Sequence, residues 1–184
     1  MKKILIVSGS RDRNGKTAKV CDSFAESLLE YETDVEKLFL PELKIEHCRQ
    51  CENNGWGKCR REGLCIIEDE FSTIINKIHS SDGVVFATPV YYGDLSESLK
   101  SFLDRLRRTT THETGKKKIE GKPVIGICVA GGGGGGSLNC SLALEKILTT
   151  AGFNILDILP VRRQNLELKL EVSKLIAKWF VKQI

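Results

Sequence analysis

The sequence predicts an α/β fold in which helices cover both faces of one parallel sheet of five strands. Short apolar runs alternate along the chain with segments whose apolar residues recur at helical spacing, and this alternation is typical of such a sheet. The 184 residues, 41% of them hydrophobic, suffice for one continuous core. No internal repeat or linker divides the chain, so we expect a single domain over residues 1–184.

The first two β/α units start from an apolar run at the N-terminus. We expect a strand at 2–7, a helix over about 17–30 and a second strand at 34–39. A cysteine-rich loop at about 40–69 follows and ends at Asp69, which can cap the next helix. Apolar residues of that helix at i, i+3, i+4 and i+7 form one stripe facing the sheet: Phe71, Ile74, Ile75 and Ile78.

The third and fourth units repeat this pattern. A strand at 83–88 stops at Pro89, and a strand at 123–130 runs into the six glycines at 131–136. The helix between these strands carries a second apolar stripe: Leu95, Leu99, Phe102, Leu103 and Leu106.

The C-terminal part completes the fold. A helix follows the glycines and ends near Gly152, a fifth strand covers about 154–159, and a last helix covers about 166–182. The inner face of the last helix is expected to consist of Val172, Leu175, Ile176, Trp179 and Phe180.

Charge and hydropathy limit the classes of binding partner and the cellular location that we expect. The formal net charge of +4 is scattered, and the run Lys116-Lys117-Lys118 is typical of a solvated loop, so we expect no nucleic-acid partner. The apolar start ends at Ser8-Gly9 and is too short for a signal peptide or a membrane span. We therefore expect a cytoplasmic protein with no membrane partner.

The loops after the first, third and fourth strands are the expected ligand site, because ligands of open parallel sheets bind outside the carboxyl ends of the strands. The first of these loops has hydroxylated residues, glycines and cationic side chains directly before a helix. Free backbone N–H groups and the positive end of the helix dipole make a phosphate its natural occupant. The candidate phosphate-binding residues are Ser8, Ser10, Arg11, Asn14, Gly15, Lys16 and Thr17.

A rival interpretation of this loop is a nucleotide-triphosphatase P-loop, because Gly15-Lys16-Thr17 resembles the end of that motif. The motif needs four residues between its two glycines, whereas five separate Gly9 from Gly15. No acidic residue ends the third or fourth strand, where a magnesium ligand is expected. The hypothesis of a phosphate-handling enzyme therefore ranks below the hypothesis that the other two loops support.

The other two loops suit a flat ring. Tyr91 and Tyr92 lie between Pro89 and Gly93, and their aromatic side chains can support a mostly apolar ring while main-chain groups bond its edge. The glycines at 131–136 favour a close approach of backbone to a ligand. Taken with the phosphate loop, they favour flavin mononucleotide, FMN.

At these loops the sequence resembles the flavodoxin-like NADPH-dependent FMN reductases, and within them the iron-sulfur flavoproteins. The family pattern Gly-Ser-Pro-Arg, then Gly-Asn-Thr, is similar to Gly9-Ser10-Arg11 and Asn14-Gly15-Lys16-Thr17 here. A second and more specific pattern corresponds to Ser81-Asp-Gly-Val-Val-Phe-Ala-Thr-Pro-Val-Tyr-Tyr-Gly93 and to Leu99-Lys-Ser-Phe-Leu-Asp-Arg105. The similarity extends from Lys2 to about Ala151.

The resemblance implies a three-layer fold with strand order 2-1-3-4-5, non-covalently bound FMN, and a homodimer or homotetramer. It implies that Ser10, Asn14, Lys16 and Thr17 hold the phosphate, although the family usually has a neutral residue at the position of Lys16. The residues implied to contact or enclose the isoalloxazine are Pro89, Val90, Tyr91, Tyr92, Gly93, Gly131, Gly132 and Gly133.

Four of the seven cysteines fall in the long loop: Cys48, Cys51, Cys59 and Cys65. Because this loop leaves the same edge of the sheet as the flavin loops, we expect the thiols near the cofactor. Iron-sulfur flavoproteins carry C-x2-C-x2-C-x4 to 7-C, which ligates a 4Fe-4S cluster, but here seven residues separate Cys51 from Cys59. A 4Fe-4S cluster, structural zinc and free thiols all remain open. The other three cysteines, Cys21, Cys128 and Cys140, are expected to be buried hydrophobes.

The main hypothesis is a flavin-dependent oxidoreductase that moves electrons between a nicotinamide nucleotide, NAD(P)H, or a redox-protein donor and an acceptor. The flavin itself supplies that chemistry, so no catalytic residue is assigned. A non-catalytic electron carrier is the alternative. Simple carriers of this fold are usually acidic, which the net charge of +4 counts against.

Overall fold

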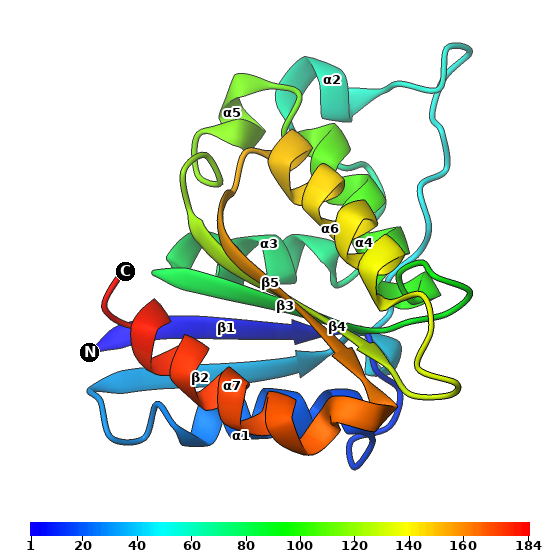
Figure 1. Ribbon diagram of the computed structural model, residues 1–184. Coiled ribbons are helices and arrows are strands. Elements are labelled where there is room, and N and C mark those ends of the chain that lie inside the picture. The colour runs from blue at the N-terminus through cyan, green and yellow to red at the C-terminus, as the bar shows by residue number, and fades with distance from the viewer.

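The computed structural model describes residues 1–184 as a parallel sheet between two layers of helices (Figure 1). The strands are β1 (Lys2–Ser8), β2 (Thr33–Phe39), β3 (Gly83–Pro89), β4 (Pro123–Ala130) and β5 (Asn154–Arg162). Their order across the sheet is β2-β1-β3-β4-β5, and every neighbouring pair is parallel. The expected fold class and strand order are confirmed.

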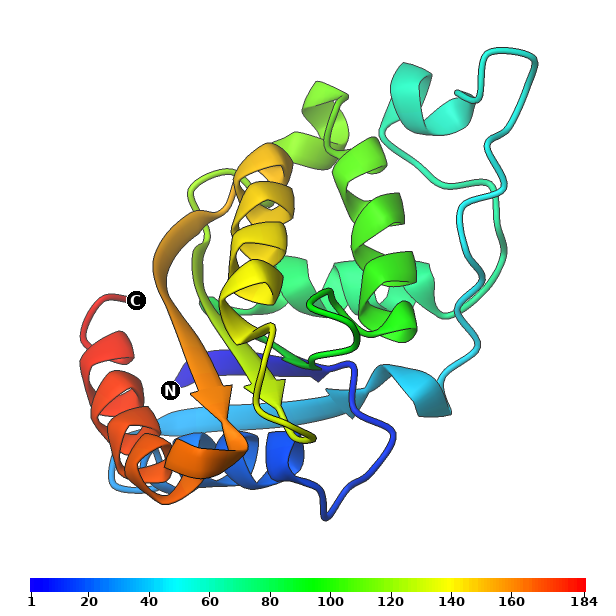
Figure 2. The same cartoon turned by 45° about the vertical axis from the view of Figure 1, so that its right-hand side comes forward.

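The helices are α1 (Lys16–Glu26), α2 (Lys58–Glu62), α3 (Phe71–Ser80), α4 (Glu97–Thr109), α5 (Glu113–Lys116), α6 (Ser137–Ala151) and α7 (Leu166–Phe180). Short 3-10 helices cover Leu40–Glu42 and Arg163–Asn165. Helices α1 and α7 lie on one face of the sheet, and α3, α4 and α6 lie on the other (Figures 1 and 2). No helix combines the length and the apolar character that a membrane crossing requires.

Two cores separate the sheet from its helices, because alternate strand residues face opposite ways. Leu5 and Val7 of β1 join the core under α3, α4 and α6, whereas Ile4 and Ile6 join the core under α1 and α7. Cys21, Cys128 and Cys140 are buried in these cores as expected, and burial raises the pKa of Cys21 to about 12. These three thiols are therefore packing residues.

The apolar stripes at 71–78 and 99–106 are confirmed, whereas Leu95 is buried but lies before the cap of α4. The expected inner face of α7 is partly wrong. Phe180 is buried and Val172 and Ile176 pack against the core as expected. Leu175 and Trp179 are instead 67% and 43% exposed, and Ser173 and Ala177 complete the buried face. Small residues are needed there because α7 packs closely along α1, where Ser23 Oγ donates to the Leu170 carbonyl at 3.0 Å. Apolar character alone did not identify that face.

Two expected boundaries and the interior of one loop also differ. Helix α1 ends at Glu26 rather than near residue 30, and β5 continues to Arg162 rather than ending near residue 159. The cysteine-rich loop contains the short helix α2, which the sequence pattern did not indicate.

The sheet has its topological switch point between β1 and β3. The chain passes from β1 to α1 on one face and from β3 to α4 on the other. The carboxyl ends of the strands at such a point are the position where open α/β sheets bind ligands.

Candidate functional site

The loops after β1, β3 and β4 meet at this switch point. Ser98 Oγ of α4 donates to the carbonyl of Gly9 at 3.1 Å, which joins the first loop to the second. A Cβ added to Gly136 would lie 2.7 Å from Gly93 Cα, so the second and third loops touch through their glycines. A Cβ at Gly131 would lie 3.7 Å from Lys16 Cδ, so the third loop returns to the first. The expected convergence is therefore present.

The first loop presents an open helix N-terminus. Helix α1 has no side-chain cap and no acidic residue in its first turn, and the backbone N–H groups of residues 16–18 have no hydrogen-bond partner. Ser8, Ser10 and Thr17 are buried beside it, whereas Lys16 is exposed. Unpaired N–H groups and the helix dipole at such an end attract an anion.

The turn before α1 is held by its own acidic residue. Asn14 N–H donates to Asp12 Oδ1 at 2.8 Å, and Ser10 Oγ donates to the Asp12 carbonyl at 3.1 Å. The Asp12 side chain packs against Gly15, where a Cβ would lie 3.0 Å from its Oδ2. This Asx turn shapes the loop while Arg11 and Asn14 remain exposed to solvent.

Arg13, the other cation of the loop, has a separate task. Its Nε donates to Glu42 Oε1 at 2.6 Å, and its guanidinium lies 4.6 Å from the centre of the Phe39 ring. The hydrogen bond from Arg13 lowers the pKa of Glu42. Arg13 thus fastens the loop to the end of β2, and Lys16 is the cation beside the open helix end.

The second loop is a tight turn that displays the two tyrosines. Tyr91 and Asp94 exchange backbone hydrogen bonds at 3.1 and 2.9 Å around Tyr92 and Gly93, both of which have positive φ. Tyr91 is 53% exposed and Tyr92 is completely exposed. Val90 N–H donates to Val129 O at 2.9 Å, so the turn is anchored on β4. The aromatic side chains are free to contact a ring.

The third loop leaves its backbone accessible. Nothing lies within 4 Å of a Cβ built on Gly132, Gly133 or Gly135, so this part of the loop borders open space. Gln164 Nε2 donates to the Gly133 carbonyl at 2.9 Å and holds the loop against the end of β5. The open glycines can approach a ligand with main-chain groups alone.

Sequence reasoning missed the residues that hold the loops together. Ser96 caps α4 and Ser98 bonds Gly9, while Gln164 bonds the glycine loop across 31 positions of sequence. Ser137, the first residue of α6, is buried with its Oγ unpaired next to the third loop. Ser96 lies three residues before Leu99, the first apolar residue of the helix, which was an available signal for the cap, whereas the Gln164 contact had none.

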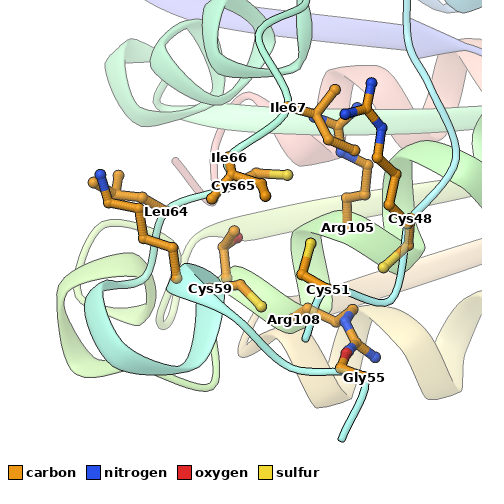
Figure 3. Close-up of a pocket in the computed structure, with 13 residues that line it drawn as sticks. Cys48, Cys51, Gly55, Cys59, Leu64, Cys65, Ile66, Ile67, Arg105 and Arg108 are labelled. Atoms are coloured by element: carbon orange, nitrogen blue, oxygen red, sulfur yellow. The ribbon is translucent and has the colours of Figure 1, made fainter. Parts of the chain in front are cut away.

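The four loop cysteines line one common pocket that opens to solvent (Figure 3). Cys48 and Cys51 come from the outgoing part of the loop, Cys59 from α2, and Cys65 from the returning part. In this arrangement no three His, Cys, Asp or Glu side chains form a binding group for a metal ion. The sequence thus brings the thiols to one place without forming a single-ion site.

The expectation that these thiols lie near the flavin loops is wrong. The pocket is lined by Arg105, Arg108 and Thr109 of α4, and Arg105 lies about 13 Å along the helix from Ser96, where the second loop ends. Figure 2 shows the loop leaving the carboxyl edge of the sheet and following α4 to its far end, where α2 lies. Contacts with α4, rather than the edge at which the loop begins, decide where the cysteines lie.

The strand order and the ligand loops at the carboxyl edge define a flavodoxin-like α/β protein. The chain belongs to the NADPH-dependent FMN reductase family, whose model matches residues 2–164.

Curated relatives include iron-sulfur flavoproteins. One from Archaeoglobus fulgidus is 29% identical over 119 residues, which cover 65% of this chain and 52% of that protein. One from Methanocaldococcus jannaschii is 28% identical over 130 residues, which cover 71% of this chain and 65% of that protein. A putative NAD(P)H-dependent FMN-containing oxidoreductase of Bacillus subtilis is 27% identical over 107 residues, covering 58% and 53%. The chain therefore spans about half to two thirds of the length of these relatives.

Solved structures share the fold at lower identity. An NAD(P)H:quinone oxidoreductase from Methanothermobacter marburgensis superposes with a TM-score of 0.69 at 18% identity, covering 95% of this chain and 94% of that one. An azoreductase from Bacillus anthracis has a TM-score of 0.68 at 17% identity, covering 96% and 99%. This likeness supports the three-layer fold.

Proposed function

We propose that the protein is an FMN-dependent oxidoreductase that accepts reducing equivalents from NADPH or NADH and passes them to an acceptor. The observation that carries the proposal is the meeting of three loops: an open helix N-terminus, a tyrosine-bearing turn and an accessible glycine backbone. The helix N-terminus suits the phosphate of FMN, the tyrosine-bearing turn suits its flat ring, and the glycine backbone suits the edge of that ring. Membership of the FMN reductase family agrees with it.

In this proposal the first loop holds the phosphate. The unpaired N–H groups of residues 16–18 donate to its oxygens and Lys16 adds positive charge. Thr17 adds a hydroxyl group, and Ser10 adds another when its Oγ–H turns from the Asp12 carbonyl to the phosphate. The buried side chains around the loop keep these donors in place before the ligand arrives. Arg11 and Asn14 lie at the rim, where they can close over the phosphate.

The other loops orient the ring. Tyr91 and Tyr92 offer aromatic faces and exclude water, Pro89 and Val90 border the turn, and Gly93 allows it to stay tight. Main-chain groups of Gly131, Gly132 and Gly133 bond the ring edge from the far side. Bound FMN supplies hydride and single-electron chemistry, and no protein acid or base is needed for that step.

The cysteine pocket is proposed to hold a 4Fe-4S cluster that exchanges single electrons with the flavin. Four thiols line it, and its other charged lining residues are all cationic: Arg49, Lys58, Arg105 and Arg108. The Nε atoms of Arg105 and Arg108 are buried without an acceptor. A thiolate-bound cluster carries net negative charge and accepts N–H hydrogen bonds at sulfur, so the donor set fits such a group. The subunits are proposed to associate as homodimers or homotetramers.

Anaerobic titration tests the function. The purified chain is loaded with FMN, and the bound-flavin absorbance is followed as NADPH or NADH is added. We expect bleaching with at least one nucleotide and recovery when an acceptor is supplied. Failure to bind FMN contradicts the whole proposal, whereas binding without bleaching by either nucleotide indicates an electron carrier fed by another protein. Iron and sulfide analysis of protein purified without oxygen tests the cluster separately.

A further inference from the structure

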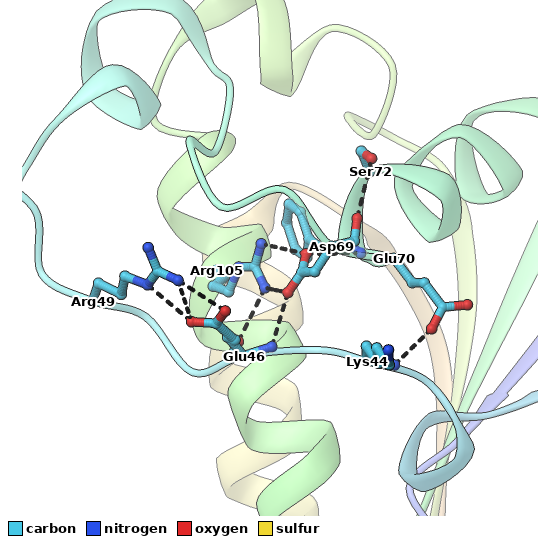
Figure 4. Close-up of polar contacts among 8 residues, drawn as sticks. Lys44, Glu46, Arg49, Asp69, Glu70, Ser72 and Arg105 are labelled. Carbon is cyan, nitrogen blue, oxygen red and sulfur yellow. Dashed lines mark hydrogen bonds and ion pairs between the residues drawn. The ribbon is translucent and has the colours of Figure 1, made fainter.

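The two ends of the cysteine loop, which we define as residues 43–70, are tied together where the loop leaves the fold (Figure 4). Lys44 N–H donates to Glu70 Oε2 at 2.6 Å, and Glu70 N–H donates to the Lys44 carbonyl at 3.1 Å. Glu46 N–H donates to Asp69 Oδ2 at 2.8 Å. The outgoing and returning segments thus form a closed neck.

Arg105 of α4 joins both sides of this neck. Its Nη1 donates to the Glu46 carbonyl at 3.0 Å and to Asp69 Oδ2 at 2.6 Å, and its Nη2 donates to Asp69 Oδ1 at 2.9 Å. The two side chains are only 1% and 5% exposed, and the guanidinium lies 4.2 Å from the centre of the Phe71 ring. A bidentate ion pair this deeply buried restricts the loop far more than a surface pair does.

Arg108, almost one turn further along α4, holds the outer part of the loop. Its Nη2 donates to the Gly55 carbonyl, and its guanidinium lies 4.1 Å from the centre of the Trp56 ring. Arg60 of α2 lies near the same ring at 5.4 Å. Positions 105 and 108 face the same side of the helix, so both reach the loop from α4.

Both arginines also line the cysteine pocket, and their Nε–H groups are buried donors without an acceptor. Three carboxylates near the pocket do not line it and are paired with cations: Glu52 with Arg61, and Glu46 and Glu62 with the lining residues Arg49 and Lys58. No acidic residue lines the pocket. An unpaired buried donor is costly, so these N–H groups favour an acceptor in the pocket, whose lining includes the four thiols.

We propose that Arg105 and Arg108 are positioning residues that clamp the cysteine loop onto α4 and direct positive charge and N–H donors at the group held by its thiols. The clamp is a property of the protein itself. Its charge role rests on the cluster proposed above.

The clamp is tested in metal-free protein that carries Trp179→Phe, so that Trp56 is the sole tryptophan. Arg105→Gln and Arg108→Gln are compared with Arg107→Gln, an adjacent α4 arginine that pairs with Asp104 and does not line the pocket. We expect alkylation of the four loop cysteines by iodoacetamide, counted by mass spectrometry, to be roughly tenfold faster or more in the first two variants. Trp56 emission should shift to longer wavelength in Arg108→Gln.

Unchanged alkylation and emission in both glutamine variants overturn the clamp. Arg105→Gln leaves Asp69 buried without its partner, so FMN binding and circular dichroism check that the variant is folded. If Arg105→Gln does not fold, Arg108→Gln and Arg108→Lys decide the question, since neither breaks a buried ion pair. Arg108→Lys keeps the charge but loses the planar group that stacks on Trp56, so it should loosen the loop as Arg108→Gln does.

The charge role is tested on protein reconstituted with iron and sulfide. Positive charge and N–H donors favour the reduced, more negative state of a cluster, so we expect a lower midpoint potential in Arg108→Gln than in Arg108→Lys or Arg107→Gln. Equal potentials in all three variants contradict this role. If the unmodified protein takes up no iron and sulfide, the cluster proposal and the charge role fail together, and the alkylation result still decides the clamp.

Discussion

At the residue scale, Asp69 combines more contacts than any motif in the sequence indicates. It pairs with Arg105, accepts the N–H of Glu46, and accepts the N–H of Phe71 at 3.1 Å at the start of α3. Burial by itself raises the pKa of Asp69, but these hydrogen bonds outweigh it, and the pKa is lowered overall. The N-cap of α3 is Glu70, so the expectation that Asp69 caps this helix is only partly right: from one position earlier Asp69 accepts the first N–H of the helix, and its larger role is to close the cysteine loop.

The first prediction concerns this pair. Asp69→Asn leaves Arg105 buried without its counter-charge, so we expect a loss of about 3–5 kcal/mol in the free energy of unfolding. Asp104→Asn is the matched control on α4, where the pairs with Lys100 and Arg107 are more exposed and worth about 0–1 kcal/mol. Urea denaturation measures both, and equal losses contradict the special role of the buried pair.

The same carboxyl gives a pH dependence. Because the pKa of Asp69 is lower in the folded state, its contribution is fully present above the unfolded value of about 3.9 and is lost as pH falls through the folded pKa. We expect the unfolding free energy of the unmodified protein to fall more steeply below about pH 4 than that of Asp69→Asn. Parallel curves contradict this assignment.

A third residue-scale prediction uses two glycines of similar backbone conformation. Gly136 and Gly121 have φ of 79° and 75°. A Cβ added to Gly136 would collide with the backbone of Gly93, whereas a Cβ added to Gly121 would meet no atom within 4 Å. Gly136→Ala should therefore separate the second and third loops and weaken FMN binding at least about tenfold, whereas Gly121→Ala shares only the strain of positive φ. Isothermal titration with FMN distinguishes them, and equal affinities show that the loops do not need this contact.

At the element scale, the N-terminus of α1 is the phosphate site of the proposed function. The prediction is that Lys16→Gln lowers the affinity for FMN by roughly ten- to hundredfold, the value of one charge-assisted contact, and leaves riboflavin binding nearly unchanged. Lys19→Gln, one turn later and exposed, is the control. The ratio of the two affinities measured by flavin fluorescence quenching isolates the phosphate, and an equal loss for both ligands places Lys16 against the ring instead.

At the same scale, helix α7 shows that the pattern of apolar residues does not always identify which face of a helix is buried. Its sequence has enough apolar residues for two faces, and the choice between them came from α1, which needs small residues at the contact. The expected stripes of α3 and α4 were right because each helix has only one apolar face to bury.

At the scale of the whole molecule, the site is assembled from segments that are far apart in sequence, so ligand binding should stabilise the entire domain. We expect FMN at 100 times its dissociation constant to raise the free energy of unfolding by about 2.7 kcal/mol. Thermal unfolding with increasing FMN measures this as a concentration-dependent Tm, with riboflavin and inorganic phosphate as partial ligands. An unchanged Tm at saturating FMN contradicts binding to the folded state.

The sequence by itself determined the fold class, all five strands, two helical stripes and the three loops that converge at the carboxyl edge of the sheet. It could do so because these features depend on local periods, on turn residues and on the rule that parallel strands present their carboxyl ends together. Only the tertiary structure decided which face of α7 is buried, that Gln164 and Ser98 hold the loops, and that the cysteines lie at the far end of α4. Those outcomes depend on contacts such as Arg105 with Asp69, in which two residues 36 positions apart are brought together by packing. Each of the two segments contributes one charged residue, and a single residue forms no sequence pattern from which the ion pair could be predicted.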